Sequence, residues 1–234
     1  MNREVVIDRR FRGPPNSGNG GYASGVVAED LEGTVTVTLR VPPPLDKRLT
    51  LATDGASSHL TDGDVLVGEA RVSSLDLEVP EPPTLAAATE ASKRYAGFEK
   101  SPFSGCFVCG SEREAGDGLL IFPGVVDGTG VVASPWIPDE TLGATDGRID
   151  QRHVWAALDC PSYYALPGAP QALLGRLTAK IDRLPEIGEP SVLIGWPQRT
   201  EGRKHFAGSA LATTDGKVIA RSDSIWIEVD ELPG

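Results

Sequence analysis

Cysteine is scarce in this chain of 234 residues, which holds Cys106, Cys109 and Cys160. A framework of several disulfides is therefore improbable for a chain of this size. The Cys-x-x-Cys spacing of the first pair is compatible with zinc, but a structural zinc site takes four ligands and usually a second pair. Because the sequence has no second pair, we expect a local structural turn and no metal. A metal site and a redox pair are the alternatives.

Long apolar runs and an excess of basic residues are also missing. No run approaches the roughly 20 apolar residues that span a bilayer, and the segment 1–11 is charged rather than shaped as a signal peptide. The 22 basic and 33 acidic residues leave a formal charge of -11, which repels nucleic-acid phosphates and anionic lipid. We therefore expect a cytoplasmic protein that binds neither nucleic acid nor membrane.

Glycine and proline are plentiful, with 27 and 19 residues, and this predicts many short strands joined by turns. Two segments have apolar residues at helical spacing instead. The first runs from about 18 to 31, after a polar cluster at 16–19 that is typical of a helix cap. The second runs from about 150 to 160, and Pro161 is expected to end it.

The same landmarks follow both predicted helices. Each helix precedes a strand-like segment with alternating apolar residues, at 34–41 and 174–184, and each segment stops at a proline. An Asp-Gly turn, at Asp62-Gly63 and again at Asp215-Gly216, then leads into an apolar strand. This repeated order predicts a duplicated chain. We place the halves at 1–98 and 99–234, with a connector helix at about 85–98 in the first half.

Several motifs resemble those of the hot-dog superfamily of acyl-thioester enzymes, in the branch similar to phenylacetate-pathway thioesterases. The run Asn16-Ser17-Gly18-Asn19-Gly20-Gly21 resembles the branch's Asn and His-Gly-Gly at the start of the central helix, with Asn19 in the place of the histidine. The family's acidic residue, nine positions further on, falls on Ala28 in the first half. In the second half, Asp159 stands nine positions after Asp150.

The run Cys106-Phe107-Val108-Cys109-Gly110, followed by Gly118-Leu119, resembles the opening strand of many such domains. With the duplication, the resemblance covers nearly the whole chain. It implies an α+β protein with a tandem double hot-dog fold, in which each half is a central helix wrapped by a curved antiparallel sheet.

The resemblance further implies one composite active site, because hot-dog dimers form their sites between two subunits and a fused pair can divide the roles. The first half would supply Asn19, Gly20 and Gly21 at a helix start, where free N–H groups polarise the thioester carbonyl. The second half would supply Asp159, which attacks directly or activates water. Simpler interpretations are a helix-start turn for the glycines and a carboxylate that bonds its own turn for Asp159.

The reciprocal site, made of Ala28 and the helix start at Asp150, lacks both the glycines and the carboxylate. We expect it to be inert or purely a binding cleft, with Asp150 an N-cap. A further set of residues is expected to contact the substrate. Its aromatic residues would line an acyl pocket, and its two basic residues would bind the phosphates of coenzyme A. The set is Asn16, Tyr22, Trp155, Tyr163, Arg203 and Lys204.

The leading hypothesis is an acyl-CoA thioesterase-like hydrolase that needs no cofactor, since coenzyme A is part of the substrate. Its partner would be a small-molecule acyl thioester, and the chain would act as a monomeric pseudo-dimer or as a homodimer of it. One alternative is a catalytically silent protein that binds acyl-CoA or another small ligand on the same scaffold. A hot-dog enoyl-CoA hydratase or dehydratase is the other.

Overall fold

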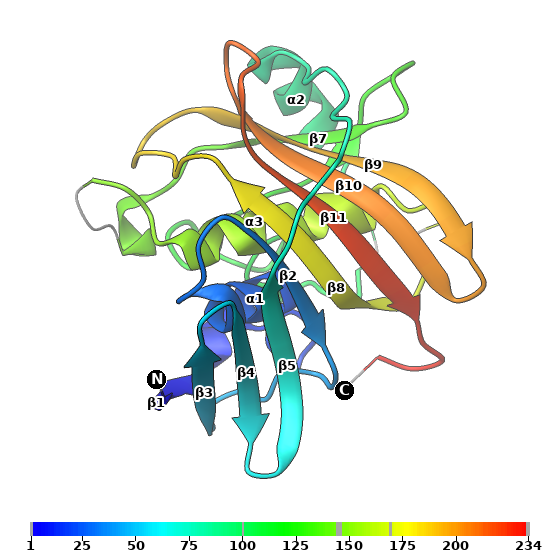
Figure 1. Cartoon of the computed structure of the whole chain (residues 1–234). Helices are drawn as coiled ribbons and strands as arrows, with labels where there is room; N and C mark the ends of the chain where they lie inside the picture. Colours follow the sequence, from blue (N-terminus) through cyan, green and yellow to red (C-terminus); the bar gives the residue numbers. More distant parts are fainter. Residues whose placement is uncertain (1, 100, 144–146, 169, 233–234) are drawn as a thin grey trace.

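A single curved sheet organises the chain. The computed structural model describes residues 2–99, 101–143, 147–168 and 170–232. Within them, eleven strands pair antiparallel in the order β1-β3-β4-β5-β2-β8-β11-β10-β9-β7-β6. The helices α1 (Gly20–Ala28) and α3 (Gln151–Tyr164) contact each other on one face of this sheet (Figure 1). No helix of the described part is long and apolar enough to cross a membrane.

The N-terminal strands surround α1. In these strands, buried apolar residues alternate with exposed polar ones, as Leu49 and Leu51 do in β3. The Asp62-Gly63 turn is confirmed: it joins β4 to β5, and Gly63 has the positive φ of 57° that glycine adopts without strain. The strands are β1 (Asn2–Val6), β2 (Thr34–Leu39), β3 (Arg48–Asp54), β4 (Ser57–Asp62) and β5 (Val65–Val72).

Four of the six described C-terminal strands are longer than any N-terminal strand, and the C-terminal set covers α3. The Asp215-Gly216 turn is confirmed as well, since it joins β10 to β11 with a φ of 84° at Gly216. The strands are β6 (Gly124–Val125), β7 (Val132–Trp136), β8 (Ala172–Ile181), β9 (Ser191–Glu201), β10 (Lys204–Thr213) and β11 (Val218–Glu228). Three short 3-10 helices are also described: η1 (Arg9–Phe11), η2 (Ala96–Phe98) and η3 (Glu140–Leu142).

The two sets of strands join where β2 pairs with β8. Val37 stands opposite Leu177 in this pair, and the Thr36 and Thr178 hydroxyl oxygens lie 2.8 Å apart. The connector predicted at 85–98 is a helix in two pieces, α2 (Leu85–Ser92) and η2. The division of the chain at residue 98 stays a prediction.

The predicted end of the second helix at Pro161 is wrong, because α3 continues through this proline to Tyr164. A proline inside a helix removes one hydrogen-bond donor and leaves nearby carbonyls short of partners. Side chains bond carbonyls at this point: Ser209 Oγ donates to Leu158 O at 2.6 Å, and Ser162 Oγ donates to Asp159 O at 2.7 Å. These bonds tie the turn around Pro161 to the neighbouring strand and to the helix itself.

The segment of Cys106 to Gly110 is a turn and not the opening strand that the resemblance implied. Cys106 N donates to Phe103 O at 2.8 Å, and Gly110 N donates to Cys106 O at 2.9 Å. These bonds close the chain on itself over a few residues, so this segment has no extended backbone to pair in the sheet. The expected local turn is therefore present, while the role of its cysteines stays a prediction.

Candidate functional site

Two glycines let α1 and α3 approach closely. A Cβ on Gly21 would lie 2.5 Å from Trp155 O and 2.6 Å from Asp159 Cβ. A Cβ on Gly25, one turn later, would lie 2.8 Å from Arg152 Cα. Any side chain at these positions would push the helices apart, so the start of α1 rests directly on the middle of α3.

The helix contact brings Asn19, Gly21 and Asp159 together. Asp159 Oδ2 accepts hydrogen bonds from Asn19 Nδ2 at 2.7 Å and from Gly21 N at 2.8 Å. Asn19 is also the N-cap of α1, since its Oδ1 accepts from Tyr22 N at 2.9 Å. The Asp159 side chain thus reaches across to the other helix and does not bond its own turn.

The Asp159 carboxyl is buried, with 2 % of the residue exposed. Burial raises the pKa of Asp159 to about 7, against the lowering effect of the Gly21 and Asn19 hydrogen bonds. Asp159 Oδ1 has no hydrogen-bond partner among the described residues. One carboxyl oxygen is therefore fixed by α1, and the other is left without a partner.

Gly20 supplies the remaining N–H group at the start of α1. In the described part of the chain, the N–H groups of Gly21 and Tyr22 are both occupied, and no hydrogen bond uses the N–H of Gly20. A Cβ on Gly20 would lie 2.8 Å from Leu174 Cβ, so this position also excludes a side chain. Gly20 is thus the helix-start donor that is free to bind a substrate oxygen.

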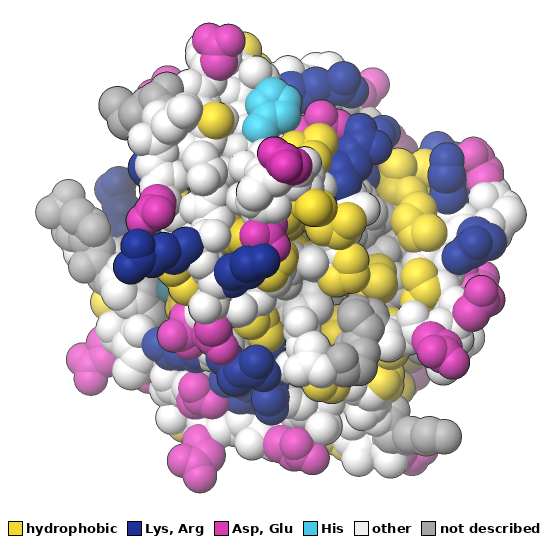
Figure 2. Space-filling view, turned by 90° about the horizontal axis from the view of Figure 1, so that it is seen from below, with side chains coloured by type: hydrophobic (Ala, Val, Ile, Leu, Met, Phe, Trp, Pro, Cys, Tyr) yellow, Lys and Arg dark blue, Asp and Glu magenta, His cyan; other side chains and the backbone are white. Residues whose placement is uncertain are grey.

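A cavity of about 240 Å³ reaches this point, and its lining includes Asn19, Gly20 and Asp159. The loop after β2 and the end of β11 border it, and both lie in the lower half of the view in Figure 1. Figure 2 shows hydrophobic side chains gathered in a hollow on the face seen from that side. The apolar walls include Phe103, Tyr163, Leu174, Trp226 and Ile227. Such walls suit a hydrocarbon chain.

The structure brings Tyr163 to this cavity but not Tyr22 or Asn16. The Tyr163 hydroxyl donates to Pro170 O at 3.0 Å while its ring lines the wall. Tyr22 turns away and stacks on Phe11, with ring centroids 3.9 Å apart. Asn16 is exposed and does not line the cavity.

Arg203 and Lys204 also lie outside the lining of the cavity. They belong to the exposed hairpin between β9 and β10, where Arg203 Nη2 donates to Glu228 O at 2.6 Å. Because Ile227 lines the cavity and Glu228 is the next residue, the hairpin lies near one wall. A role for this pair in phosphate binding stays a prediction.

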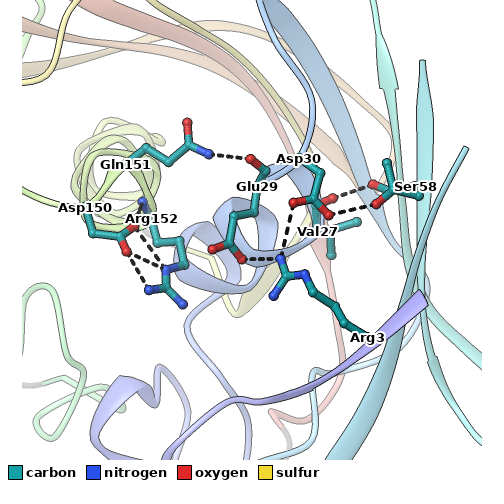
Figure 3. Close-up of polar contacts among 9 residues, drawn as sticks. Arg3, Val27, Glu29, Asp30, Ser58, Asp150, Gln151 and Arg152 are labelled. Atoms are coloured by element: carbon teal, nitrogen blue, oxygen red, sulfur yellow. Dashed lines mark hydrogen bonds and ion pairs between the residues drawn. The ribbon is translucent and has the colours of Figure 1, made fainter. Parts of the chain in front are cut away.

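Trp155 lines a different cleft of about 640 Å³, together with Ala28 and the C-terminal end of α1. This cleft is the reciprocal position, where α3 begins beside α1. The N-cap role of Asp150 is confirmed, because its Oδ1 accepts from Arg152 N at 2.8 Å (Figure 3). Gln151 Nε2 donates to Glu29 O at 3.0 Å, and this contact closes the start of α3 against α1.

Two acidic groups of the reciprocal cleft, Glu29 and Asp30, are paired with one cation. Glu29 Oε2 lies 2.6 Å from Arg3 Nη2, and the same guanidinium reaches Asp30 Oδ1 at 3.6 Å (Figure 3). Ala28 has no polar side chain to offer. The two helix contacts therefore differ: one presents a buried carboxyl with an unpartnered oxygen, and the other presents ion pairs.

Sequence reasoning missed two groups beside the cavity. Cys160 joins Cys106 and Cys109, and the three sulfurs lie within 4.8 Å of one another. Hydrogen bonds from the thiols of Cys109 and Cys160 lower the pKa of Cys106. The adjacency of Cys160 to Asp159 could have pointed to this group.

The second group is a cluster of arginines. Four arginines line a surface depression of about 310 Å³ together with two acidic residues: Arg9, Arg10, Arg12, Arg113, Glu112 and Asp117. Arg12 and Gly105 in this depression directly precede Gly13 and Cys106, which line the cavity. The run Arg9-Arg10-Phe11-Arg12 was the signal for it in the sequence.

No family model matches the sequence, and no curated protein matches it. Solved structures do resemble the fold. A candidate thioesterase II from Thermobifida fusca has a TM-score of 0.61 at 12% identity, covering 97% of this chain and 91% of its own. The tesB protein of Mycobacterium avium subspecies paratuberculosis has a TM-score of 0.59 at 11% identity, with 97% and 92% covered.

A candidate oleoyl thioesterase from Lactobacillus plantarum has a TM-score of 0.56 at 9% identity, covering 98% of this chain and 96% of its own. Identities this low show the fold and not the activity. Over nearly its whole length, the chain has the hot-dog-type fold of thioesterase-superfamily proteins.

Proposed function

We propose that the protein is an acyl-CoA thioesterase-like hydrolase with one composite active site, built on a tandem double hot-dog fold. One observation carries the proposal. The start of α1 holds the buried Asp159 carboxyl of α3 by one oxygen, at the wall of an apolar cavity. This contact between the two helices supports the proposal without any assumption about the protonation state of Asp159.

Each group has a distinct role in this mechanism. Asn19 Nδ2 and Gly21 N orient the carboxylate through Oδ2, so that Oδ1 is available to the reaction. Oδ1 takes a proton from water, and the resulting hydroxide attacks the thioester carbonyl carbon. The N–H of Gly20 stabilises the oxyanion that develops. When the C–S bond breaks, the proton passes to the departing thiolate.

The surroundings of the site support a thioester of coenzyme A with an apolar acyl group. The acyl group would lie along Phe103, Tyr163 and Trp226 in the cavity. The carrier's phosphates would contact the arginine depression at Arg10 and Arg12, which adjoins the cavity. Guanidinium groups bind phosphate oxygens through two parallel hydrogen bonds.

A catalytically silent acyl-CoA-binding protein is the second candidate. It is favoured by one contact, because the N–H of Gly21 is bonded to Asp159 and is not free for a substrate carbonyl. The hydratase alternative has less support. His153 is buried among the rings of Phe11, Tyr22 and Phe107, so it does not pair with Asp159.

Acyl-CoA turnover, measured for the wild type and for matched variants, distinguishes between these functions. The purified chain would be incubated with short, aromatic and medium-chain acyl-CoAs while free thiol is detected. We expect release of thiol that Asp159→Asn lowers by at least about 100-fold, with the fold retained. Asp150→Asn, at the reciprocal helix start, should keep most of the activity.

Binding of acyl-CoA without release of thiol, unaffected by Asp159→Asn, would establish the silent protein instead. Hydration of enoyl-CoA in the absence of hydrolysis would exclude both candidates.

A further inference from the structure

Three thiols converge on the wall of the cavity. Cys106 and Cys109 come from one turn, and Cys160 comes from α3. Their sulfur atoms lie within 4.8 Å of one another, and those of Cys106 and Cys160 are 3.9 Å apart. In a tetrahedral zinc site with Zn–S bonds of about 2.3 Å, two sulfurs lie roughly 3.8 Å apart. The distance between Cys106 and Cys160 is therefore that of two ligands on one cation, and the sulfur of Cys109 lies within 4.8 Å of both.

The turn that carries two of the sulfurs is held in place. Gly110 N donates to Cys106 O at 2.9 Å, and a Cβ on Gly110 would lie 2.4 Å from that oxygen. The hydroxyl of Tyr95 donates to Cys109 O at 2.9 Å. Phe107 N donates to Arg12 O at 2.8 Å, which ties the turn to the segment before α1. Metal ligands need such outer supports to keep their orientation.

Donors are also aimed at one of the sulfurs. Val108 N lies 3.4 Å from Cys106 Sγ, and Asn19 Nδ2 lies 3.9 Å from the same atom. Hydrogen bonds to sulfur stabilise a thiolate, which is the form that binds metal. Thiols that only fill space in a core do not need them.

The donor set selects the type of cation. All three ligands are sulfur, which suits soft or borderline ions such as Zn²⁺ and not Mg²⁺ or Ca²⁺. Three protein ligands leave one of the four zinc positions open. All three cysteines line the cavity, so a fourth ligand would reach the ion from there.

We propose that Cys106, Cys109 and Cys160 bind one Zn²⁺ through their sulfur atoms at the wall of the cavity. Each thiol that is still protonated gives up its proton on binding, so the site forms as a Zn²⁺ complex of three thiolates. This proposal goes beyond the hydrolase and does not depend on it, since the metal site is defined by its own ligands.

The test uses the full chain, purified under reducing conditions. Zinc content would be measured by mass spectrometry of the elements, and apo-protein would be titrated with Co²⁺. We expect one zinc per chain and intense sulfur-to-cobalt absorption that saturates at one Co²⁺ per chain. Metal binding should also release protons, at most three per metal ion, because only thiols that are still protonated give one up.

Variants locate the ligands. Cys106→Ser, Cys109→Ser and Cys160→Ser should each weaken metal binding by more than the roughly 10–100-fold that loss of an outer-shell partner costs. Asp159→Asn should keep the metal while it loses hydrolysis, so failure of one proposal is distinguishable from failure of the other. If a serine variant does not fold, the wild-type cobalt spectrum and proton count still decide the matter.

Wild-type protein that binds neither zinc nor cobalt stoichiometrically would overturn the proposal. Serine variants that bind as tightly as the wild type would also overturn it. A disulfide among these cysteines in the reduced preparation, seen as a mass about 2 Da lower, would assign the group to redox chemistry instead.

Discussion

The variant Gly21→Ala tests whether the contact between α1 and Asp159 matters for catalysis beyond its contribution to the stability of the fold. The new Cβ would lie 2.5 Å from Trp155 O and 2.6 Å from Asp159 Cβ, and van der Waals contact needs about 1 Å more. Overpacking of this kind costs about 1–3 kcal/mol, and the better helix propensity of alanine returns up to about 1 kcal/mol. We expect a net loss of up to about 3 kcal/mol and a Tm up to about 12 °C lower.

The catalytic activity of Gly21→Ala should fall by more than the loss of folded protein explains. A displacement of about 1 Å between catalytic groups costs roughly 100-fold in rate. The assay is thioester hydrolysis under conditions in which circular dichroism shows the variant to be folded. We expect kcat/KM about 100-fold below that of the wild type.

Gly25→Ala is the matched control on the same helix face. Its Cβ would lie 2.8 Å from Arg152 Cα, so the strain is similar but occurs one turn away from Asp159. It should lower Tm by a similar amount while costing much less activity. Equal activity losses in the two variants, or full activity in Gly21→Ala, would refute the role of the α1 start in holding Asp159.

Three further predictions concern the surroundings of the site. Burial lowers the pKa of His153 to about 4. Between about pH 6.5 and 4, this histidine is therefore protonated in the unfolded chain but neutral in the folded chain. Stability should fall by about 3 kcal/mol over this window, and His153→Gln should remove that part of the slope in urea unfolding at each pH. Tyr95→Phe loses the hydrogen bonds to Cys109 O and Tyr164 Oη, and calorimetry should show a loss of about 1–3 kcal/mol. Gly195→Ala places a Cβ 2.0 Å from Pro161 O, and we expect more than about 3 kcal/mol of destabilisation or no soluble protein on expression.

Local patterns in the sequence were enough to predict the helix starts and the turns. Asn19 and Asp150 are short polar residues before helical segments, and both are N-caps in the structure. The Asp-Gly turns at Gly63 and Gly216 follow from the positive φ that each turn demands. These features depend on neighbours in sequence, so a single sequence reveals them.

Contacts between distant segments could not be predicted in the same way. Pro161 stays inside α3, where partners such as Ser209, on another strand, bond nearby carbonyls. Cys160 meets the Cys106 turn only because α3 packs beside it. A resemblance implied that Gly21 and Asp159 belong to one site, but it did not predict that the N–H of Gly21 binds Asp159 Oδ2.

The most direct measurement is a crystal structure with a ketone analogue of an acyl-CoA, in which a methylene group replaces the sulfur. If α1 and α3 form one hydrolytic site, the ketone oxygen should accept a hydrogen bond from Gly20 N, with the carbonyl carbon beside Asp159 Oδ1. The acyl chain should then lie against Phe103 and Tyr163. An analogue bound in the cleft at Ala28, or one whose carbonyl lies away from Asp159, would contradict the account.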